Sequence, residues 1–109
     1  MPWLLRDGAV LASLEVADDV RTRSRGLMGR ETFDGAILLK PAMQVHTIGM
    51  RFPIDVAYLD RDLKVVAIVT GMRPRRLGRP RFGARAVVEA EAGAFDRWGL
   101  RVGDELEVQ

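Results

Sequence analysis

A pair of strand-forming segments with a short polar turn between them constrains the fold of this chain more than any other feature. Residues 54–59 and 64–69 are rich in Val and Ile, and the tripeptide Asp60-Arg61-Asp62 separates them. Branched and aromatic residues favour extended backbone, and a short polar break between two such runs is typical of a β-hairpin. The sequence therefore predicts two antiparallel strands here.

Further strands and two short helices are predicted along the rest of the chain. The segments with strand-like composition are residues 3–5, 10–16, 36–39, 45–48, 86–90 and 105–108. Asp7-Gly8 has the chemistry of a hairpin turn between the first two of these strands. Asp18-Asp19 offers a cap for a helix over residues 20–28 that ends at Gly29, and residues 91–99 suit a second helix. An Arg-, Pro- and Gly-rich loop is expected over residues 71–83.

Many short strands with only two helical turns predict a mainly β fold, a β-rich α+β domain built as a compact sandwich or a small barrel. The chain has 109 residues, of which 48% are hydrophobic and 29% are charged. This length and composition are ordinary for one globular domain with a single hydrophobic core. We expect residues 1–109 to form a single domain.

The chain contains no cysteine. Disulfides, a thiol nucleophile and a thiolate metal site are therefore excluded. Residues 1–8 show neither a basic leader nor an apolar run of signal-peptide length, and no stretch approaches the ~20 apolar residues of a membrane-spanning helix. We expect a cytoplasmic protein without membrane association.

The only histidine, His46, lies in an apolar segment that also carries Arg51 and Asp55. Imidazole is the one side chain that ordinarily titrates near ambient pH, so His46 is the natural candidate for a base, a proton donor or a metal ligand. We predict a ligand-binding patch of His46, Thr47, Arg51 and Asp55, with Arg25 nearby. In the catalytic alternative, Asp55 orients the imidazole and Arg51 anchors a carboxylate or phosphate.

A structural role for the same residues is the more common outcome in proteins. On a regular strand, residues two apart share a face, so the odd separation of His46 and Asp55 opposes them unless Gly49 or Pro53 interrupts the alternation. Asp55 would then pair with an arginine or cap a turn, and His46 would pack partly buried. We therefore expect binding or structure before catalysis, and we assign no catalytic residue.

A basic segment follows the central hairpin. Residues 73–85 contain no acidic residue and carry Arg73, Arg75, Arg76, Arg79, Arg81 and Arg85. Several arginines on one surface would suit nucleic-acid phosphates, but the segment has one aromatic residue and no recognised nucleic-acid motif. A solvated loop that packs its arginine stems over the domain is the expectation we favour.

Two further groups of charged residues have both a structural and a functional interpretation. Arg25 and Arg30 could clamp an anion, but we expect Leu27 and Met28 to anchor that segment in the core while the arginines meet carboxylates or helix-end carbonyls. Glu89 and Glu91 could form a carboxylate pair of the glycosidase type, but we expect them to receive arginine side chains instead.

Four short motifs occur in the order and spacing of one protein family. They are Arg25-Gly26-Leu27-Met28-Gly29-Arg30, then Val45-His46-Thr47 with residues 50–56, then residues 83–89 with Ala92-Gly93, and finally Gly99-Leu100 with Val102-Gly103-Asp104. Together they resemble the DUF192 family over nearly the whole chain. The chain resembles the branch that reads His-Thr where many relatives have aromatic and polar residues. The resemblance implies one compact β-rich domain and supplies no catalytic residue.

These observations leave three functions open. The one we favour is a non-enzymatic protein that binds a small anionic ligand or a protein partner through the patch around His46, Arg51 and Asp55. The alternatives are a small enzyme with His46 as acid or base, and nucleic-acid association through the arginine loop. Of the possible partners, nucleic acid is the one we favour least. Neither serine lies in a nucleophile motif, and no glycine-rich phosphate loop occurs. We expect neither a cofactor nor a metal ion.

Overall fold

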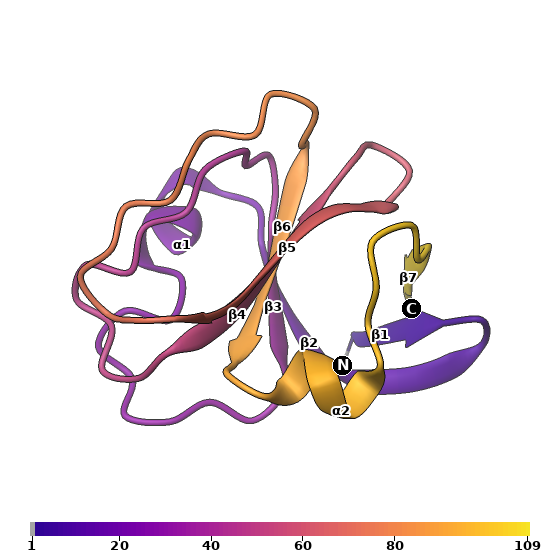
Figure 1. Cartoon of the computed structure of the whole chain (residues 1–109), viewed down its shortest axis with the longest axis horizontal. Coiled ribbons are helices and arrows are strands. Elements are labelled where there is room, and N and C mark those ends of the chain that lie inside the picture. The colour runs from indigo at the N-terminus through magenta and orange to yellow at the C-terminus, as the bar shows by residue number, and fades with distance from the viewer. Residues whose placement is uncertain (1) are drawn as a thin grey trace.

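Seven strands form one sheet in the computed structural model, in the order β5-β4-β6-β3-β2-β1-β7 (Figure 1). The structure describes residues 2–109. The strands are β1 Trp3–Arg6, β2 Ala9–Ala17, β3 Ala36–Leu39, β4 Ile54–Leu59, β5 Val65–Met72, β6 Ala86–Glu91 and β7 Leu106–Val108, and the helices are α1 Val20–Arg25 and α2 Ala94–Trp98. Neighbouring strands are antiparallel except β2 and β3, which are parallel and joined by a crossover that contains α1.

The two edges of the sheet meet, so the sheet curls into a small barrel. Lys64, just before β5, bridges to Glu105, just before β7. The Leu106 amide donates to the Leu63 carbonyl at 3.0 Å, and the Val65 amide donates to Asp104 at 2.8 Å. Of the two predicted architectures, the barrel is the one that forms, because closure pairs edge strands that would otherwise expose unsatisfied backbone groups.

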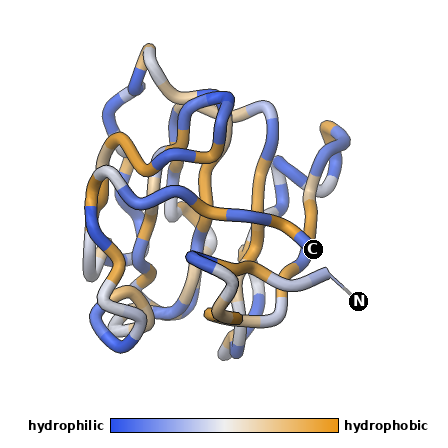
Figure 2. The backbone as a smooth tube through the Cα atoms, turned by 90° about the vertical axis from the view of Figure 1, so that its right-hand side faces the viewer, coloured by the Kyte–Doolittle hydropathy of each residue, from blue (hydrophilic) through white to orange (hydrophobic). Residues whose placement is uncertain are grey.

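Both faces of the central strands are buried. Side chains alternate across a strand, so β3, β4 and β6 send every second residue into each of two cores. One core includes Leu38, Val88 and Phe95, and the other includes Leu39, Val87 and residues from the loops beside α1. Hydrophobic residues run through the middle of the molecule, and hydrophilic residues lie at many of its outer bends (Figure 2). The second core lies between the sheet and a layer formed by α1 and two long loops, which covers one face of the sheet (Figure 1).

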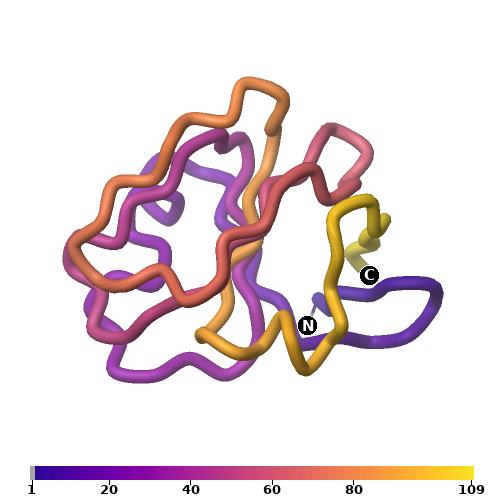
Figure 3. The backbone as a smooth tube through the Cα atoms, in the orientation of Figure 1, coloured from indigo at the N-terminus to yellow at the C-terminus, as the bar shows by residue number. Residues whose placement is uncertain are grey.

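Strand β1 lies beside the last residues of the chain (Figure 3). Strand β1 pairs with both β2 and β7, and the Trp3 amide donates to the Gln109 carbonyl at 2.7 Å. None of the helices formed by residues 2–109 is long and apolar enough to cross a membrane.

Most predicted elements are confirmed, and the exceptions have local causes. The hairpin of residues 54–69 forms as β4 and β5, and Asp19 caps α1 by accepting from the Thr22 amide at 2.8 Å. The helix predicted to end at Gly29 stops earlier, because Gly26 adopts φ +49° and closes it by donating to the Thr22 carbonyl. Residues 45–48 are not a strand. They make a single bridge, from His46 to Leu77, before the chain turns at Gly49.

Candidate functional site

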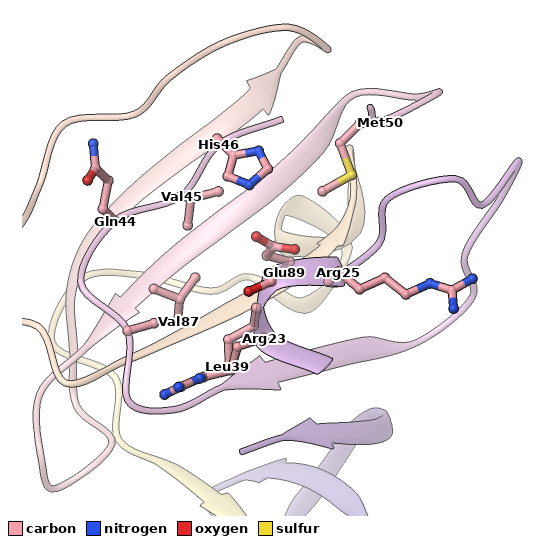
Figure 4. A pocket seen from close by; sticks show the side chains of 12 residues that line it. Arg23, Arg25, Leu39, Gln44, Val45, His46, Met50, Val87 and Glu89 are labelled. Carbon is pink, nitrogen blue, oxygen red and sulfur yellow. The ribbon is translucent and has the colours of Figure 1, made fainter. Parts of the chain in front are cut away.

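A pocket of about 50 Å³ lies between α1, residues 42–50, and strands β3 and β6 (Figure 4). Its apolar walls are formed by Leu39, Val45, Met50 and Val87. Four ionisable side chains also line it: His46, Glu89, Arg23 and Arg25. The residues come from four separate parts of the chain, so only the folded protein assembles this pocket.

Glu89 is held in the pocket by its position on β6. In the register of the sheet it lies opposite Ile37 of β3 and Val56 of β4, so apolar side chains flank it on both sides. It is 2% exposed, and its Oε1 atom has no hydrogen-bond partner among residues 2–109. Burial disfavours the charged form and raises the pKa of Glu89 to about 7. A carboxyl group that changes charge near neutral pH therefore faces the pocket.

His46 faces the same pocket from the opposite wall. Backbone hydrogen bonds fix its segment: the Gly78 amide donates to Val45 at 2.8 Å, and the Thr47 amide donates to Arg76 at 2.8 Å. The Nδ1 atom of His46 is buried and lacks a hydrogen-bond partner in the described part of the chain. In Figure 4 the imidazole ring and the Glu89 carboxylate both point into the pocket.

The end of α1 forms the third wall. A Cβ atom at Gly26 would lie 3.4 Å from Oε1 of Glu89, so the helix end approaches the carboxylate closely. Arg23 and Arg25 line the pocket, but their guanidinium groups extend away from Glu89 (Figure 4). Arg23 instead donates to the Pro41 carbonyl at 3.2 Å. The arginines thus lie at the rim and leave the buried carboxylate without an ion pair among residues 2–109.

Asp55, a member of the predicted patch, lies on the other face of the sheet. It pairs with Ala90, the neighbour of Glu89 on β6, and successive residues on a strand point to opposite faces. Its carboxylate accepts from the amides of Gly71 at 2.9 Å, Gly93 at 3.0 Å and Phe95 at 3.1 Å. Asp55 therefore ties β4 to the end of β5 and the start of α2, and it does not reach the pocket that His46 lines.

Thr47 and Arg51 are also outside the pocket. The buried Thr47 hydroxyl donates to the Arg73 carbonyl at 2.6 Å and accepts from the Arg76 amide at 2.8 Å. Arg51 is exposed and lies 3.5 Å from Glu31. Of the five predicted patch residues, the structure brings His46 and Arg25 to one pocket and places the other three elsewhere.

The model of the DUF192 family, described as an "Uncharacterized ACR", matches residues 4–108. The chain belongs to the DUF192 family. It is 32% identical over 99 residues to a UPF0127 protein of Pyrococcus abyssi, covering 86% of this chain and 84% of that one. A UPF0127 protein of Pyrococcus furiosus is 33% identical over 96 residues, which cover 84% and 82% of the two chains.

Solved structures share the fold of this DUF192 chain. A protein of unknown function from Novosphingobium aromaticivorans has a TM-score of 0.83 at 22% identity, covering 97% of this chain and 82% of that one. A Sinorhizobium meliloti protein named as a proposed transcription regulator has a TM-score of 0.81, also at 22% identity, with 98% and 91% covered. At this level of identity the likeness extends to the fold alone.

A sharp turn at Gly49, just before residues 50–56 of the second motif, packs against Met28 of the first motif in this DUF192 chain. Gly49 has φ +85°, and a Cβ atom there would lie 2.6 Å from Cγ of Met28. Leu27, in the first motif, is fully buried, as predicted, and Arg30 meets both carboxylate oxygens of Glu15 at 2.8 and 3.2 Å. The motif therefore anchors α1 above the pocket, while Arg30 takes part in a surface ion pair.

Glu89 is the site residue to which the sequence analysis assigned a different role. Its predicted role, to receive an arginine side chain, is wrong, because the central strand buries it among apolar residues. The signal was present in the run Ala86-Val87-Val88-Glu89-Ala90, where one acidic residue interrupts an otherwise apolar strand. A strand that is apolar on both faces is buried on both faces, and an acid within it has to be buried too.

The arginine loop of the DUF192 chain runs beside residues 42–47. Arg81 is half-buried and lies over the ring of Tyr58 at 5.2 Å, and burial raises the pKa of that tyrosine. The remaining arginines of the predicted basic surface, Arg73, Arg75, Arg76, Arg79 and Arg85, are exposed. Across residues 2–109, no group of three or more His, Cys, Asp or Glu side chains could hold a metal ion.

Proposed function

We propose that this DUF192 protein binds a small anionic ligand in the pocket between α1 and β6, where His46 and Glu89 contact it. Two buried polar atoms support this proposal: Nδ1 of His46 and Oε1 of Glu89 line one pocket and lack partners among residues 2–109. Each buried polar atom without a hydrogen bond costs about 1–3 kcal/mol. A ligand that bonds both atoms would recover that free energy.

The size of the pocket limits which part of a ligand enters it. A volume of about 50 Å³ accommodates a few water-sized groups. Typical small-molecule sites are several times larger. We therefore propose that only the polar head group of the ligand lies between His46 and Glu89, while the rest of the ligand extends past α1.

The charges around the pocket favour an anion. Arg23 and Arg25 lie at the rim, and Glu89 is the acidic residue within it. Because the pKa of Glu89 is about 7, a large share of the carboxyl is protonated at neutral pH. A protonated carboxyl does not repel an anion and can donate a hydrogen bond to a ligand oxygen. Small carboxylates and phosphate esters are the ligand class we propose, with affinity that falls as the pH rises above 7.

A nuclear magnetic resonance screen tests this proposal on the full chain labelled with ¹⁵N. The probes are small carboxylates and phosphates, and small amines serve as the contrasting set. We expect carboxylates or phosphates to shift the amide signals of Gly26, His46 and Glu89, and His46→Phe to abolish the shifts. Glu91→Gln, an exposed change on the same strand, is the matched control. Shifts that map elsewhere, or that persist in His46→Phe, would contradict the proposal.

Acid–base catalysis is a second candidate, supported by one specific observation. A carboxyl with a pKa of about 7 shares a small pocket with an imidazole, and such groups are suited to donate and accept protons near neutral pH. In this version Glu89, rather than Asp55, is the partner of His46. Chemical conversion of a bound probe, lost in both His46→Phe and Glu89→Gln, would favour it over binding alone. For both functions we propose a cytoplasmic location, as expected from the sequence.

A further inference from the structure

A groove of about 340 Å³ lies beside the arginine loop, and Ala42 lines both this groove and the His46 pocket. Its walls are formed by Pro41, Ala42, Met43, Phe82, Ala84 and Arg85, and we name it the Phe82 groove. The Phe82 side chain is 83% exposed, and Met43 is 37% exposed. A concave surface with a largely exposed aromatic ring is unusual for a solvent-facing loop, and exposed apolar surface of this kind commonly marks an interaction site.

The backbone holds both walls of the Phe82 groove in place. The Arg81 amide donates to the Met43 carbonyl at 2.7 Å, and the Ala42 amide donates to the Arg85 carbonyl at 3.0 Å. The Ala84 amide closes a turn by donating to the Arg81 carbonyl at 2.8 Å. Because these bonds join the two loops that form the walls, a partner would not have to order them on binding.

The surroundings of the groove are strongly positive. Arg85 lines the groove, and Arg79 lies three residues before Phe82 in a segment without any acidic residue. Both arginines are exposed, and neither forms an ion pair among residues 2–109. A partner that enters the groove would therefore meet unpaired positive charge at its edge.

We propose that the Phe82 groove binds an acidic peptide segment of a partner protein, which inserts one large apolar side chain against Phe82 and Met43. The volume suits one such side chain, and carboxylates flanking it would pair with Arg79 and Arg85. A second copy of this chain docked groove to groove would bring the same arginines against each other. Nucleic acid would use the arginines but not the apolar walls, and a flat lipid surface does not fill a concave groove.

Selection from a random-peptide display library, with the full chain as bait, tests this inference. Phe82→Ser and Arg85→Glu disrupt the groove, and both side chains are exposed, so the fold should survive. Val102→Ser, which is 62% exposed near β7, and Arg97→Glu on α2 are the matched controls. Thermal unfolding of each variant checks that the fold is intact.

The expected result is enrichment of peptides that combine several acidic residues with one large apolar residue. A synthetic copy of an enriched peptide should bind the controls as it binds the unchanged protein. It should bind Phe82→Ser and Arg85→Glu at least about tenfold more weakly. The inference is overturned if no peptide is enriched, if the enriched peptides lack acidic residues, or if they bind Phe82→Ser unchanged. Phe82-dependent binding to phosphatidylserine vesicles or single-stranded DNA that the peptide does not compete would likewise overturn it.

Discussion

Replacing Glu89 with glutamine should remove a pH dependence from the stability of the fold. The side chain is 2% exposed, and apolar neighbours on β3 and β4 flank it. Glutamine has nearly the same shape but cannot ionise. The substitution therefore keeps the packing of β6 and eliminates the cost of a buried negative charge.

The magnitude follows from the pKa of Glu89, which burial raises from 4.5 to about 7. The folded protein holds the proton more tightly than the unfolded chain, so the stability that this group contributes is complete below pH 4.5. It is lost as the pH rises from 4.5 to about 7, and it changes no further above that pH. The difference between the two pKa values corresponds to about 3 kcal/mol in the free energy of unfolding.

Urea unfolding between pH 4 and pH 9 measures this effect. Other carboxylates also contribute to the profile, so the informative quantity is the difference between the unchanged protein and Glu89→Gln at each pH. We expect that difference to move in favour of Glu89→Gln by about 3 kcal/mol across the window. Glu91→Gln, an exposed change on the same strand, should follow the unchanged protein. Parallel profiles for Glu89→Gln and the unchanged protein would refute the reasoning.

Three further substitutions test the structural roles assigned above, each by urea unfolding. Asp55→Ala should lower the free energy of unfolding by about 3 kcal/mol or more, because three backbone amides lose their acceptor; a loss below about 1 kcal/mol would contradict this. Thr47→Val should cost about 1–3 kcal/mol while Thr47→Ser retains most stability, and equal losses would contradict the role of the hydroxyl. Glu15→Gln should cost less than about 1 kcal/mol, because its ion pair with Arg30 is partly exposed; a larger loss would show a buried role.

The strands could be predicted from the sequence because each one is a short local run of residues that favour extended backbone. Residues 54–69 contain two strand-forming runs around a short turn, and that information lies within the hairpin itself. The information that sets the register between distant strands does not lie within any one segment. The parallel pairing of β2 with β3 and the bridge from Lys64 to Glu105 depend on contacts across long stretches of chain. Likewise, Gly26 and Gly29 both have the composition of a helix end, and the sequence does not say which of them ends α1, whereas the structure ends the helix at Gly26.

The candidate site was only partly predictable for a related reason. His46 was found because it is the only histidine, and Arg25 because it lies in a recognisable motif. Asp55 was grouped with them by proximity in sequence, whereas the pleat of β4 directs it to the other face. Glu89 lies 43 residues from His46, and only the pairing of β6 between β3 and β4 buries it near the imidazole.

The central claim is that β6 presents a buried, unpaired carboxyl to the pocket that His46 lines. The most direct test is a ¹³C nuclear magnetic resonance titration of the Glu89 side-chain carboxyl in the full chain. A midpoint near pH 7 is the predicted result. A midpoint near 4.5, the ordinary value for glutamate, would show a solvated or paired carboxylate and would contradict the account of the site.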